Sequence, residues 1–374
     1  MPRSPEGHPD LAALRDTIAE VDRGILELLR RRMELAARVG EVKAATGAPV
    51  VARNVEDRVY TRARQHAEAC GVSPEVMEAI FQAIIRGSVE RQHRIGMAAR
   101  ARRGGRVLVV GGAGGMGSWF RRFLAEGGHR VDTVDPAWRT VPDLPGRFTS
   151  LRAAGDLDVY DHVIVSVPLP ATPAVLSALA GRRVRATVVE IASIKSHLTG
   201  ALADAEAAGV EVVDLHPMFG PSKSLYEALT FVVAARDGAG GAAEVLEPLL
   251  RHPTTELVTI PFERHDRLMG WLLGLAHLSG MLFGTALARS GLDPRELAAC
   301  ASTTFSRQAA TAQSVLSEDP GLYLDIQRLN PHRGEVYAAV RDALGDLLSL
   351  VEAGDREGFA ATLAAARRSL EGPG

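Results

Sequence analysis

The first part of the chain carries a helical pattern of apolar residues without a proline between Asp10 and Thr46. The apolar positions recur every three or four residues: Leu11, Leu14, Ile18, Val21, Ile25, Leu28, Leu35, Val39 and Val42. This spacing is typical of one side of an amphipathic helix. We therefore predict one long helix that has Asp10 as its N-cap and ends at Gly47 and Pro49.

Two further helices are predicted over Val55–Ala69 and Ser73–Arg94, with Gly71 and Ser73 as the stop and cap between them. Three helices, one of them much longer than a small domain is wide, cannot bury their apolar faces within a single copy. We therefore expect an all-α N-terminal domain that forms an entwined dimer.

After residue 105 the pattern changes to short apolar runs typical of buried parallel strands. The run Arg106–Val110 is followed at once by glycines that fit G-x-G-x-x-G, namely Gly112, Gly114 and Gly117, with Met116 among them. In this motif the first glycine permits a tight turn, the second lets the backbone approach a pyrophosphate, and the third lets helix and strand pack closely. The helix predicted over Ser118–Ala125 offers its positive N-terminus to the phosphates.

An acid stands where a dinucleotide site needs one. The strand predicted over Arg130–Asp135 ends in Asp135, 135 − 117 = 18 residues beyond Gly117. A carboxylate at this place accepts hydrogen bonds from ribose hydroxyls and repels a 2′-phosphate, which favours NAD over NADP. A glycine-rich turn without a ligand is the alternative, and the strand, helix and acid together disfavour it.

Four more strands are predicted, over Asp161–Pro168, Val184–Ile191, Val210–Leu215 and Thr230–Ala234. Strands that alternate with helical stretches predict a mostly parallel, doubly wound α/β Rossmann sheet. Such sheets bind ligands at the carboxyl ends of their strands. The polar and turn residues at those ends are Ser166, Pro168, Ser193, Lys195 and His216. Their convergence predicts a site.

From Pro261 onward the pattern is helical, and we predict an all-α dimerisation domain. Its predicted helices are Leu268–Ala288, Pro294–Ser317, Gly321–Leu329 and Arg333–Glu352. The first is long enough to cross a bilayer. However, it contains four glycines and lacks basic or aromatic belts at both ends, which favours the centre of a core or an oligomer interface.

The pattern divides the 374 residues into a helical domain (1–98), a linker (99–105), a dinucleotide-binding domain (106–260) and a helical domain (261–374). The net charge of −2 argues against nucleic acid or an anionic membrane as partner. Two cysteines far apart, Cys70 and Cys300, form no metal site or disulfide framework, and the N-terminus carries no apolar signal segment. We expect a cytoplasmic protein without a metal.

The strings ALRDTIAEVD, RRRMELAARVGEVKA and SVERQ resemble the small all-helical chorismate mutases. The resemblance implies a substrate dianion that rearranges without covalent help, so that catalysis consists of holding a compact conformer and stabilising charge. It assigns Arg32, and Arg15 from the partner subunit, to the two carboxylates. It assigns the remaining roles to Ser88 as a substrate contact, Lys43 and Gln92 as donors to the ether oxygen, and Glu56 as acceptor for the group on ring carbon 4.

The strings VVGGAGGMG, VIVSVPLP, EIASIK and LHPMFGP resemble prephenate dehydrogenases over residues 105 to about 350. Mutase followed by dehydrogenase resembles the bifunctional enzymes of enteric bacteria. The resemblance implies hydride transfer from carbon 4 to NAD with loss of the ring carboxylate as carbon dioxide. His216 would accept the hydroxyl proton, Ser193 would hold His216 or the hydroxyl, and Lys195 would supply positive charge. His265 would bind substrate, and His277 fits either a core role or a ligand contact.

The sequence departs from both families near the substrate. Val55 precedes Glu56 where mutases often have arginine, and Ser314 stands where dehydrogenases have the arginine that grips the ring carboxylate. Arg307, on the same predicted helix, is one possible substitute, and Arg328 or Arg333 on the next are others. Losing that contact without a substitute costs about 2–4 kcal/mol of binding.

Three functions follow from these observations. The first converts chorismate through prephenate to 4-hydroxyphenylpyruvate in tyrosine biosynthesis. The second acts on the 4-amino-4-deoxy analogues and makes 4-aminophenylpyruvate for a specialised metabolite. Because a protonated amine at carbon 4 is cationic, the loss of arginine beside Glu56 fits the second, but the Ser314 change does not. The third is a non-catalytic sensor of NAD and an aromatic metabolite. Lys43, Gln92 and His216 argue against the third, and we place the first ahead.

Overall fold

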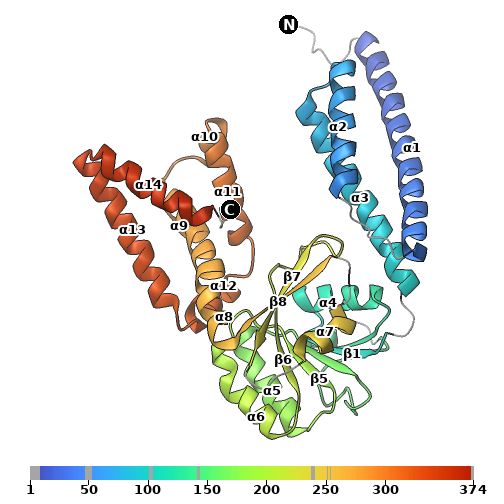
Figure 1. Cartoon of the computed structure of the whole chain (residues 1–374), viewed down its shortest axis with the longest axis vertical. Coiled ribbons are helices and arrows are strands. Elements are labelled where there is room, and N and C mark those ends of the chain that lie inside the picture. The colour runs from blue at the N-terminus through green and yellow to red at the C-terminus, as the bar shows by residue number, and fades with distance from the viewer. Residues whose placement is uncertain are drawn as a thin grey trace.

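The structure, a computed structural model, describes residues 9–46, 53–100, 104–140, 144–236, 241–250, 252 and 254–371. Within these ranges the side chains of 9–10, 53–57, 68, 93, 96–100 and 243 are not described. Figure 1 shows three parts: a group of long helices at the N-terminus, a central sheet covered by helices, and a second helical group at the C-terminus. The predicted fold class is confirmed.

The N-terminal part consists of α1 (Pro9–Thr46), α2 (Arg53–Cys70) and α3 (Pro74–Arg100). Both α1 and α2 pack against α3. The predicted N-cap at Asp10 is wrong, because the helix begins at Pro9 and Asp10 is its second residue; proline fits the first helical position. The end predicted for α3 is also wrong: the helix continues six residues beyond Arg94, so the first two residues of the predicted linker are helical.

The central sheet has eight strands in the order β3-β2-β1-β4-β5-β6-β7-β8. They are β1 (Arg106–Val110), β2 (Arg130–Val134), β3 (Arg147–Phe148), β4 (His162–Val165), β5 (Thr187–Glu190), β6 (Val212–Pro217), β7 (Leu229–Ala235) and β8 (Thr255–Pro261). The first six run parallel, and β7 is antiparallel to β6. The strand order reverses between β1 and β4, which opens a crevice at their carboxyl ends. The mostly parallel sheet is thus confirmed, whereas β3 and β8 were not predicted.

Two apolar cores cover the two faces of the sheet, because side chains alternate along each strand. Leu108 and Val110 of β1 face one core, and Val107 and Val109 face the other. The first core is closed by α5 (Thr172–Gly181) and α6 (Thr199–Ala207), the second by α4 (Gly115–Glu126) and α7 (Ala242–Leu250). The described residues of this part also form the short 3₁₀ turns η2 (Pro136–Thr140), η3 (Leu169–Ala171) and η4 (Ser196–Leu198).

The C-terminal part begins with a continuous helical run over Phe262–Ser290. It consists of α8 (Phe262–Met269), a π-helical segment η5 (Gly270–Leu275) and α9 (Ala276–Ser290). The helices that follow are α10 (Pro294–Ala299), α11 (Thr303–Leu316), α12 (Pro320–Leu329), α13 (Arg333–Ala353) and α14 (Arg356–Leu370). The single helix predicted over Pro294–Ser317 is wrong, since Ser302 caps a new helix by accepting a hydrogen bond from the Phe305 N–H.

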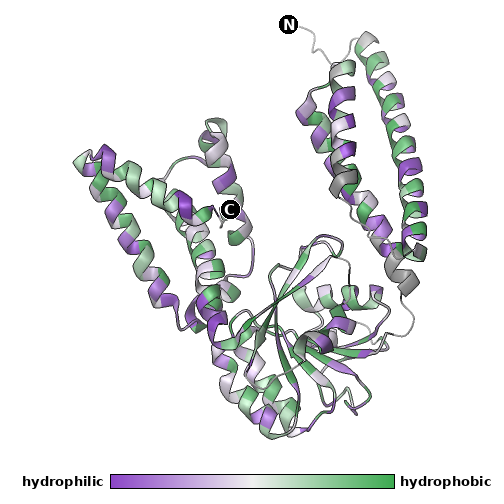
Figure 2. Cartoon of the chain, in the orientation of Figure 1, coloured by the Kyte–Doolittle hydropathy of each residue, from purple (hydrophilic) through white to green (hydrophobic). Residues whose placement is uncertain are grey.

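The run over Phe262–Ser290 is long and apolar enough to cross a membrane by length and composition, and only 11% of its most apolar window is buried. The side chains of α9 pack against α11, and η5 contacts α12 and α13. Figure 2 shows apolar residues on the strands of the sheet and, alternating with polar ones, along the surface helices at both ends of the chain.

The helical N-terminal part contacts the central part through the end of α3. Arg94 Nε donates a hydrogen bond of 3.1 Å to the Tyr226 hydroxyl, which in turn bonds Glu126 on α4. Four residues earlier on α3, the Ser224 hydroxyl bonds Glu90 Oε1 at 3.3 Å. The last turns of α3 therefore contact the loop between β6 and β7.

Candidate active sites

Three of the predicted mutase residues lie together between α1 and α3. The Arg32 guanidinium donates hydrogen bonds to the Ser88 hydroxyl and, at 3.2 Å, to the Ile84 carbonyl. Partial burial lowers the pKa of Arg32 from its usual value, yet a guanidinium stays charged. Gln92 lies one turn beyond Ser88 and is 9% exposed, and its Oε1 is buried without a partner in the described part of the chain.

The close crossing of the two helices explains Gly40. A Cβ at this position would lie 2.9 Å from Gln92 Cα, so only glycine lets the two backbones approach in this way. Lys43, three residues further along α1, is half-buried. The structure thus places Arg32, Lys43, Ser88 and Gln92 along one seam, as the resemblance implies.

Arg15 is exposed and lies far from this cluster in the same chain. Seventeen residues separate it from Arg32 on one helix, which corresponds to about 25 Å along the axis. One chain therefore cannot bring both arginines to a small substrate. The side chains of Val55 and Glu56 lie outside the described residues, so their predicted roles remain predictions.

An apolar stripe runs along the exposed side of α1. We define it as Leu14, Ile18, Val21, Ile25, Leu28, Leu35, Val39 and Val42, which are 45–67% exposed. At 100° per residue this stripe lies on the same side of α1 as Arg32 and Lys43. Water-exposed aliphatic residues over eight turns of helix indicate a surface that another helix covers.

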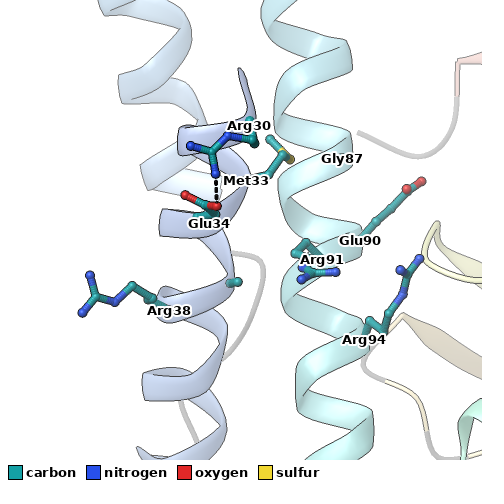
Figure 3. Close-up of a pocket in the computed structure, with 9 residues that line it drawn as sticks. Arg30, Met33, Glu34, Arg38, Gly87, Glu90, Arg91 and Arg94 are labelled. Atoms are coloured by element: carbon teal, nitrogen blue, oxygen red, sulfur yellow. Dashed lines mark hydrogen bonds and ion pairs between the residues drawn. The ribbon is translucent and has the colours of Figure 1, made fainter. Parts of the chain in front are cut away.

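A groove of about 620 Å³ lies on the other side of the α1–α3 seam (Figure 3). Its lining residues are Arg30, Met33, Glu34, Ala37, Arg38, Gly87, Glu90, Arg91 and Arg94. None of the predicted mutase residues is among them. The groove is thus separate from the seam with Arg32 and Gln92, and faces the side on which Glu90 and Arg94 contact the central part.

The glycine loop joins β1 to α4, and the structure changes one of its predicted roles. The tight turn is made by Gly111, with φ of +88°, and not by Gly112. Gly112 is needed instead because a Cβ there would lie 2.6 Å from Thr133 Cβ on β2. At Gly117 a Cβ would lie 2.0 Å from the Gly111 carbonyl oxygen, which confirms the predicted close packing.

The start of α4 is open to an anion. Gly114 is its exposed N-cap and provides no side-chain cap. The N–H groups of Gly115, Met116 and Gly117 have no acceptor among the described residues. Uncapped N–H groups at the positive end of a helix bind phosphate. The loop therefore has the donors that a pyrophosphate requires.

Asp135 and the end of β4 border the same crevice. The Asp135 carboxylate accepts hydrogen bonds from the N–H groups of Ala113, at 3.0 Å, and Ala137, at 2.9 Å. This ties the acid at the end of β2 to the glycine loop. Across the crevice, the carbonyl of Ser166 lies so close to Gly111 that a Cβ on Gly111 would be 2.0 Å away. Pro168 follows and is exposed.

His216 lies at the carboxyl end of β6 and is 3% exposed. Its Nδ1 is 3.0 Å from Nε2 of His265, and His265 Nδ1 is 2.7 Å from Oδ1 of Asp266. Burial holds the pKa of His216 well below its ordinary 6.5, and neighbouring His265 and Lys195 add to the lowering. His216 is therefore neutral at physiological pH, as a general base must be.

Lys195 is fully buried, and its ammonium group lies between Glu190 of β5 and Leu215 of β6. Its Nζ pairs with the Glu190 carboxylate and donates a hydrogen bond of 2.8 Å to the Leu215 carbonyl, next to His216. Burial raises the pKa of Glu190 to about 8, against the lowering by Lys195. Lys195 therefore holds its positive charge beside the backbone of Leu215, the residue before His216.

Of the other predicted dehydrogenase residues, His265 contacts His216 directly. Ser193 is half-buried, and its hydroxyl has no hydrogen-bond partner within the described ranges. His265 is 0% exposed, and its two ring nitrogens are engaged by His216 and Asp266. His277 packs edge-on against Tyr323 with ring centroids 4.4 Å apart.

The position of the missing arginine is nevertheless close to the site. Glu318, one turn after Ser314, approaches Gly220 in the loop after His216, where a Cβ would lie 4.0 Å from its Oε1. Arg307 is exposed and lies seven residues before Ser314, about 10 Å further along α11. Arg333 donates to the carbonyls of Arg328 and Asn330. The structure thus places Arg307 about two turns of α11 from Ser314 and ties the Arg333 guanidinium to backbone carbonyls at the end of α12.

Sequence reasoning missed Asp266 and Glu190. Asp266 directly follows His265 at the beginning of a long apolar helix, and Glu190 ends an otherwise aliphatic strand. A charged residue inside a buried apolar segment requires a partner, and this signal was present in the sequence.

Comparisons with known proteins agree with the three parts. The family described as chorismate mutase type II matches residues 14–93. The nucleotide-binding domain of prephenate dehydrogenase matches 148–237, and its dimerization domain matches 261–365. The chain is 31% identical over 355 residues to a T-protein of Enterobacter agglomerans, covering 94% of this chain and 91% of that protein. It is 32% identical over 273 residues to a 4-amino-4-deoxyprephenate dehydrogenase of Streptomyces pristinaespiralis, covering 71% of this chain and 91% of that protein.

Among solved structures, prephenate dehydrogenase from Aquifex aeolicus in complex with hydroxyphenyl propionate and NAD+ aligns with a TM-score of 0.59 at 20% identity, covering 72% of this chain and 98% of that one. Synechocystis arogenate dehydrogenase aligns with a TM-score of 0.52 at 17% identity, covering 71% and 99%. These likenesses show a shared fold for the central and C-terminal parts.

Proposed function

The chain belongs to the T-protein family of bifunctional chorismate mutase/prephenate dehydrogenases, and from this premise we propose that it performs both reactions. The helical part rearranges chorismate to prephenate. The central and C-terminal parts oxidise and decarboxylate prephenate to 4-hydroxyphenylpyruvate with NAD. We propose the domain limits predicted from the sequence, except that the linker begins at residue 101, because residues 99 and 100 belong to α3.

In the mutase half the residues hold and stabilise a dianion without covalent chemistry. Arg32, oriented by Ser88, binds one carboxylate, and Arg15 of the partner subunit binds the other. Lys43 and Gln92 donate hydrogen bonds to the ether oxygen, where negative charge develops as its bond breaks. Glu56 accepts from the group on carbon 4. The burial of Gln92 one turn beyond Ser88 supports this assignment, because it places an amide on the seam beside Arg32.

In the dehydrogenase half the residues around α4 fit NAD. The open N–H groups of Gly115, Met116 and Gly117 would hold the pyrophosphate, and Asp135 would accept from the adenosine ribose. Gly112 and Gly114 shape this loop, and Ser166 and Pro168 border it across the crevice. When bound, NAD supplies the acceptor for the hydride that leaves carbon 4.

The observation that carries the dehydrogenase assignment is the placement of a buried, neutral His216 next to this loop. Pro221, five residues after His216, lies against Gly115, where a Cβ would be 3.0 Å from the proline ring. The base and the nucleotide loop thus border one crevice. His216 takes the proton of the carbon-4 hydroxyl while hydride leaves, and the gain of aromaticity drives the loss of carbon dioxide.

We propose a homodimer with small-molecule substrates. Two surfaces support it: the apolar stripe of α1, which lies beside Arg32, and the C-terminal helices, which match a dimerization domain. The run over Phe262–Ser290 then serves the second interface rather than a membrane. We also propose a soluble, cytoplasmic location, and no binding of nucleic acid, in line with the near-zero net charge.

The test supplies purified protein and NAD with either chorismate or 4-amino-4-deoxychorismate, and follows substrate loss and NADH. We expect NADH from chorismate. If NADH forms only from the amino compound, the proposed substrate is wrong and the 4-amino-4-deoxy analogue takes its place. The 32% identity to a 4-amino-4-deoxyprephenate dehydrogenase is the reason for including this compound. Binding of NAD without turnover of either compound would overturn the proposal in favour of a sensor. As a control, Arg32→Ala should block NADH formation from chorismate but not from prephenate.

A further inference from the structure

Three buried side chains form a hydrogen-bonded chain that ends at the proposed base. The exposed fractions of His216, His265 and Asp266 are 3%, 0% and 2%. The Nδ1···Nε2 distance between the two histidines is 3.0 Å, and the Nδ1···Oδ1 distance from His265 to Asp266 is 2.7 Å. Nε2 of His216 has no partner within the described part of the chain, so it is the ring nitrogen left for a ligand.

Asp266 anchors this chain at its far end. Its two carboxylate oxygens accept hydrogen bonds from the backbone N–H groups of Lys195, at 2.8 Å, and Ser196, at 2.7 Å. Burial opposes ionisation, but the hydrogen bonds from His265, Ser196 and Lys195 outweigh it and hold the pKa of Asp266 at about 2. An ionised carboxylate can only accept hydrogen bonds.

This fixes the proton positions one after another. Because Asp266 only accepts, His265 must carry its proton on Nδ1. Burial lowers the pKa of His265, so the ring is neutral and its Nε2 has a lone pair. That nitrogen accepts from Nδ1–H of His216, and the neutral His216 ring is left with a lone pair on Nε2. No other arrangement of protons on two neutral rings satisfies all three groups.

We propose that Asp266 and His265 are positioning residues that hold His216 in the tautomer whose Nε2 can take the substrate's hydroxyl proton. This inference rests on the proposed dehydrogenase function. The proton moves from the carbon-4 hydroxyl to Nε2, the C–O bond becomes a carbonyl, and the C–H electron pair leaves as hydride to NAD. His216 becomes a cation that keeps its Nδ1–H bond to His265, and through it faces the negative charge of Asp266.

The other charged groups packed against the pair are arranged to keep His216 neutral before reaction. Lys195 lies under β6, its charge disfavours a second cation, and it is paired with Glu190. Asp214, on the same strand as His216, pairs with Arg236 at 2.7 Å. The carboxylate that faces the two histidines directly is therefore Asp266.

The main test replaces Asp266 by Asn in the full chain. In either orientation the NH₂ of the new amide meets a backbone N–H, that of Lys195 if it faces His265 or that of Ser196 if it does not. The first orientation reverses both tautomers and places a proton on His216 Nε2, and both remove the negative charge that favours the His216 cation. We expect the dehydrogenase kcat to fall by about 10²–10⁴-fold, as wrong-tautomer variants of histidine bases do, with KM for prephenate and NAD changed less than about threefold. Unchanged NAD binding reports that the central part is folded, and mutase activity reports the same for the N-terminal helices. Asp293→Asn, the same change at an exposed helix cap, should alter neither activity.

A second pair of variants separates positioning from packing. His265→Gln keeps an acceptor oxygen for His216 Nδ1–H, whereas His265→Leu fills the space without one. We expect the Leu variant to lose at least about tenfold more kcat than the Gln variant. Equal losses in the two variants, or a kcat for Asp266→Asn within about fivefold of the parent, would overturn the inference.

A readout without turnover keeps this inference distinct from the proposed function. In ¹⁵N-histidine NMR of the NAD-free protein at neutral pH, His216 should be protonated at Nδ1, and Asp266→Asn should add a population protonated at Nε2. If the parent protein forms no NADH from any substrate but shows these tautomers, the function fails and the positioning stands. Protonation at Nε2 in the parent would refute the positioning.

Discussion

The dehydrogenase site is assembled inside one chain, whereas the mutase site lies open along the side of α1. His216, His265 and Asp266 are at most 3% exposed and already bonded to one another. On α1, by contrast, Ile25 is 49% and Leu28 67% exposed, and Arg15 lies in solvent far from Arg32.

The difference follows from what each reaction needs. Proton abstraction needs a neutral base held in one tautomer, and burial within a single domain provides it. Binding a dianion needs several cations around a small volume, which a thin layer of helices can supply only with a second copy. The dehydrogenase half should therefore respond to changes in its own core, and the mutase half to changes on its surface.

The largest effect is expected for His216→Asn. Removing the base should lower the dehydrogenase kcat by about 10³-fold and leave the mutase rate within about twofold, measured by NADH formation from prephenate and by chorismate loss. A parallel loss of both activities would contradict the separation of the two sites. NAD binding to the variant serves as the control for folding of the central part.

A charge in the apolar stripe should give the reverse result. Ile25→Glu places a carboxylate where we propose a second copy, and burying it unpaired costs several kcal/mol. We expect about 10²-fold loss of mutase activity with the dehydrogenase within a few-fold, and sedimentation should show weakened association. Leu26→Glu is the matched control, because Leu26 is 64% exposed but lies off the stripe. Equal effects of the two variants would argue against the stripe as the interface.

A smaller loss is expected for Gly40→Ala. The new methyl would lie 2.9 Å from the backbone of Gln92, so α3 must move away from α1. Overpacking of this kind costs about 1–3 kcal/mol, and the displaced Gln92 should reduce mutase activity by about tenfold. Gly24→Ala on the same helix has no atom within 4 Å and should be neutral or stabilising. Retention of full activity by Gly40→Ala would show that the crossing is looser than described.

Acid should weaken the dehydrogenase half first. Burial lowers the pKa of six histidines, all between residues 129 and 277: His129, His162, His197, His216, His265 and His277. In the unfolded chain they take up protons below about pH 6.5, whereas in the folded chain they do so only at lower pH, so the free energy of unfolding falls as pH drops from 6.5. Glu190 has the opposite sign between pH 8 and 4.5, but it is one group against six.

All three tryptophans, Trp119, Trp138 and Trp271, lie in the central and C-terminal parts, so their fluorescence reports on unfolding of that half. Each kcal/mol lost should lower its Tm by about 2–4 °C. An unchanged tryptophan transition between pH 7 and pH 5 would contradict the prediction.

The sequence was sufficient for the three parts and for the glycine loop, because period and glycine spacing are local signals. Gly117, Asp135 and His216 occupy the places that a strand–loop–helix unit dictates, whereas Arg32 and Ser88 came from the resemblance to chorismate mutases. The edge strands β3 and β8 were missed because they depend on pairing with strands elsewhere in the fold. The break before Ser302 was missed although its cap, which bonds the Phe305 N–H, is a local signal.

The roles of His265 and Lys195 were beyond sequence reasoning for a different reason. Both residues match dehydrogenase positions, but what a histidine or lysine does depends on which atoms surround it. Only the fold shows that His265 faces His216 and Asp266, and that Lys195 points under β6 to Glu190. The contact that replaces the arginine at Ser314 is likewise not determined by pattern.

The π-helical segment Gly270–Leu275 sets the rotational phase of the C-terminal part. Twelve residues separate His265 from His277, which in a regular α-helix would place them about 120° apart. One extra residue in the π turn reduces this to about 20°, so His277, against Tyr323, shares the face on which His265 meets His216. Deleting one residue from this segment would turn all of α9 by about 100° and carry Gly280 and Gly284 away from α11. The register of the C-terminal helices therefore depends on the single π-helical turn that follows α8.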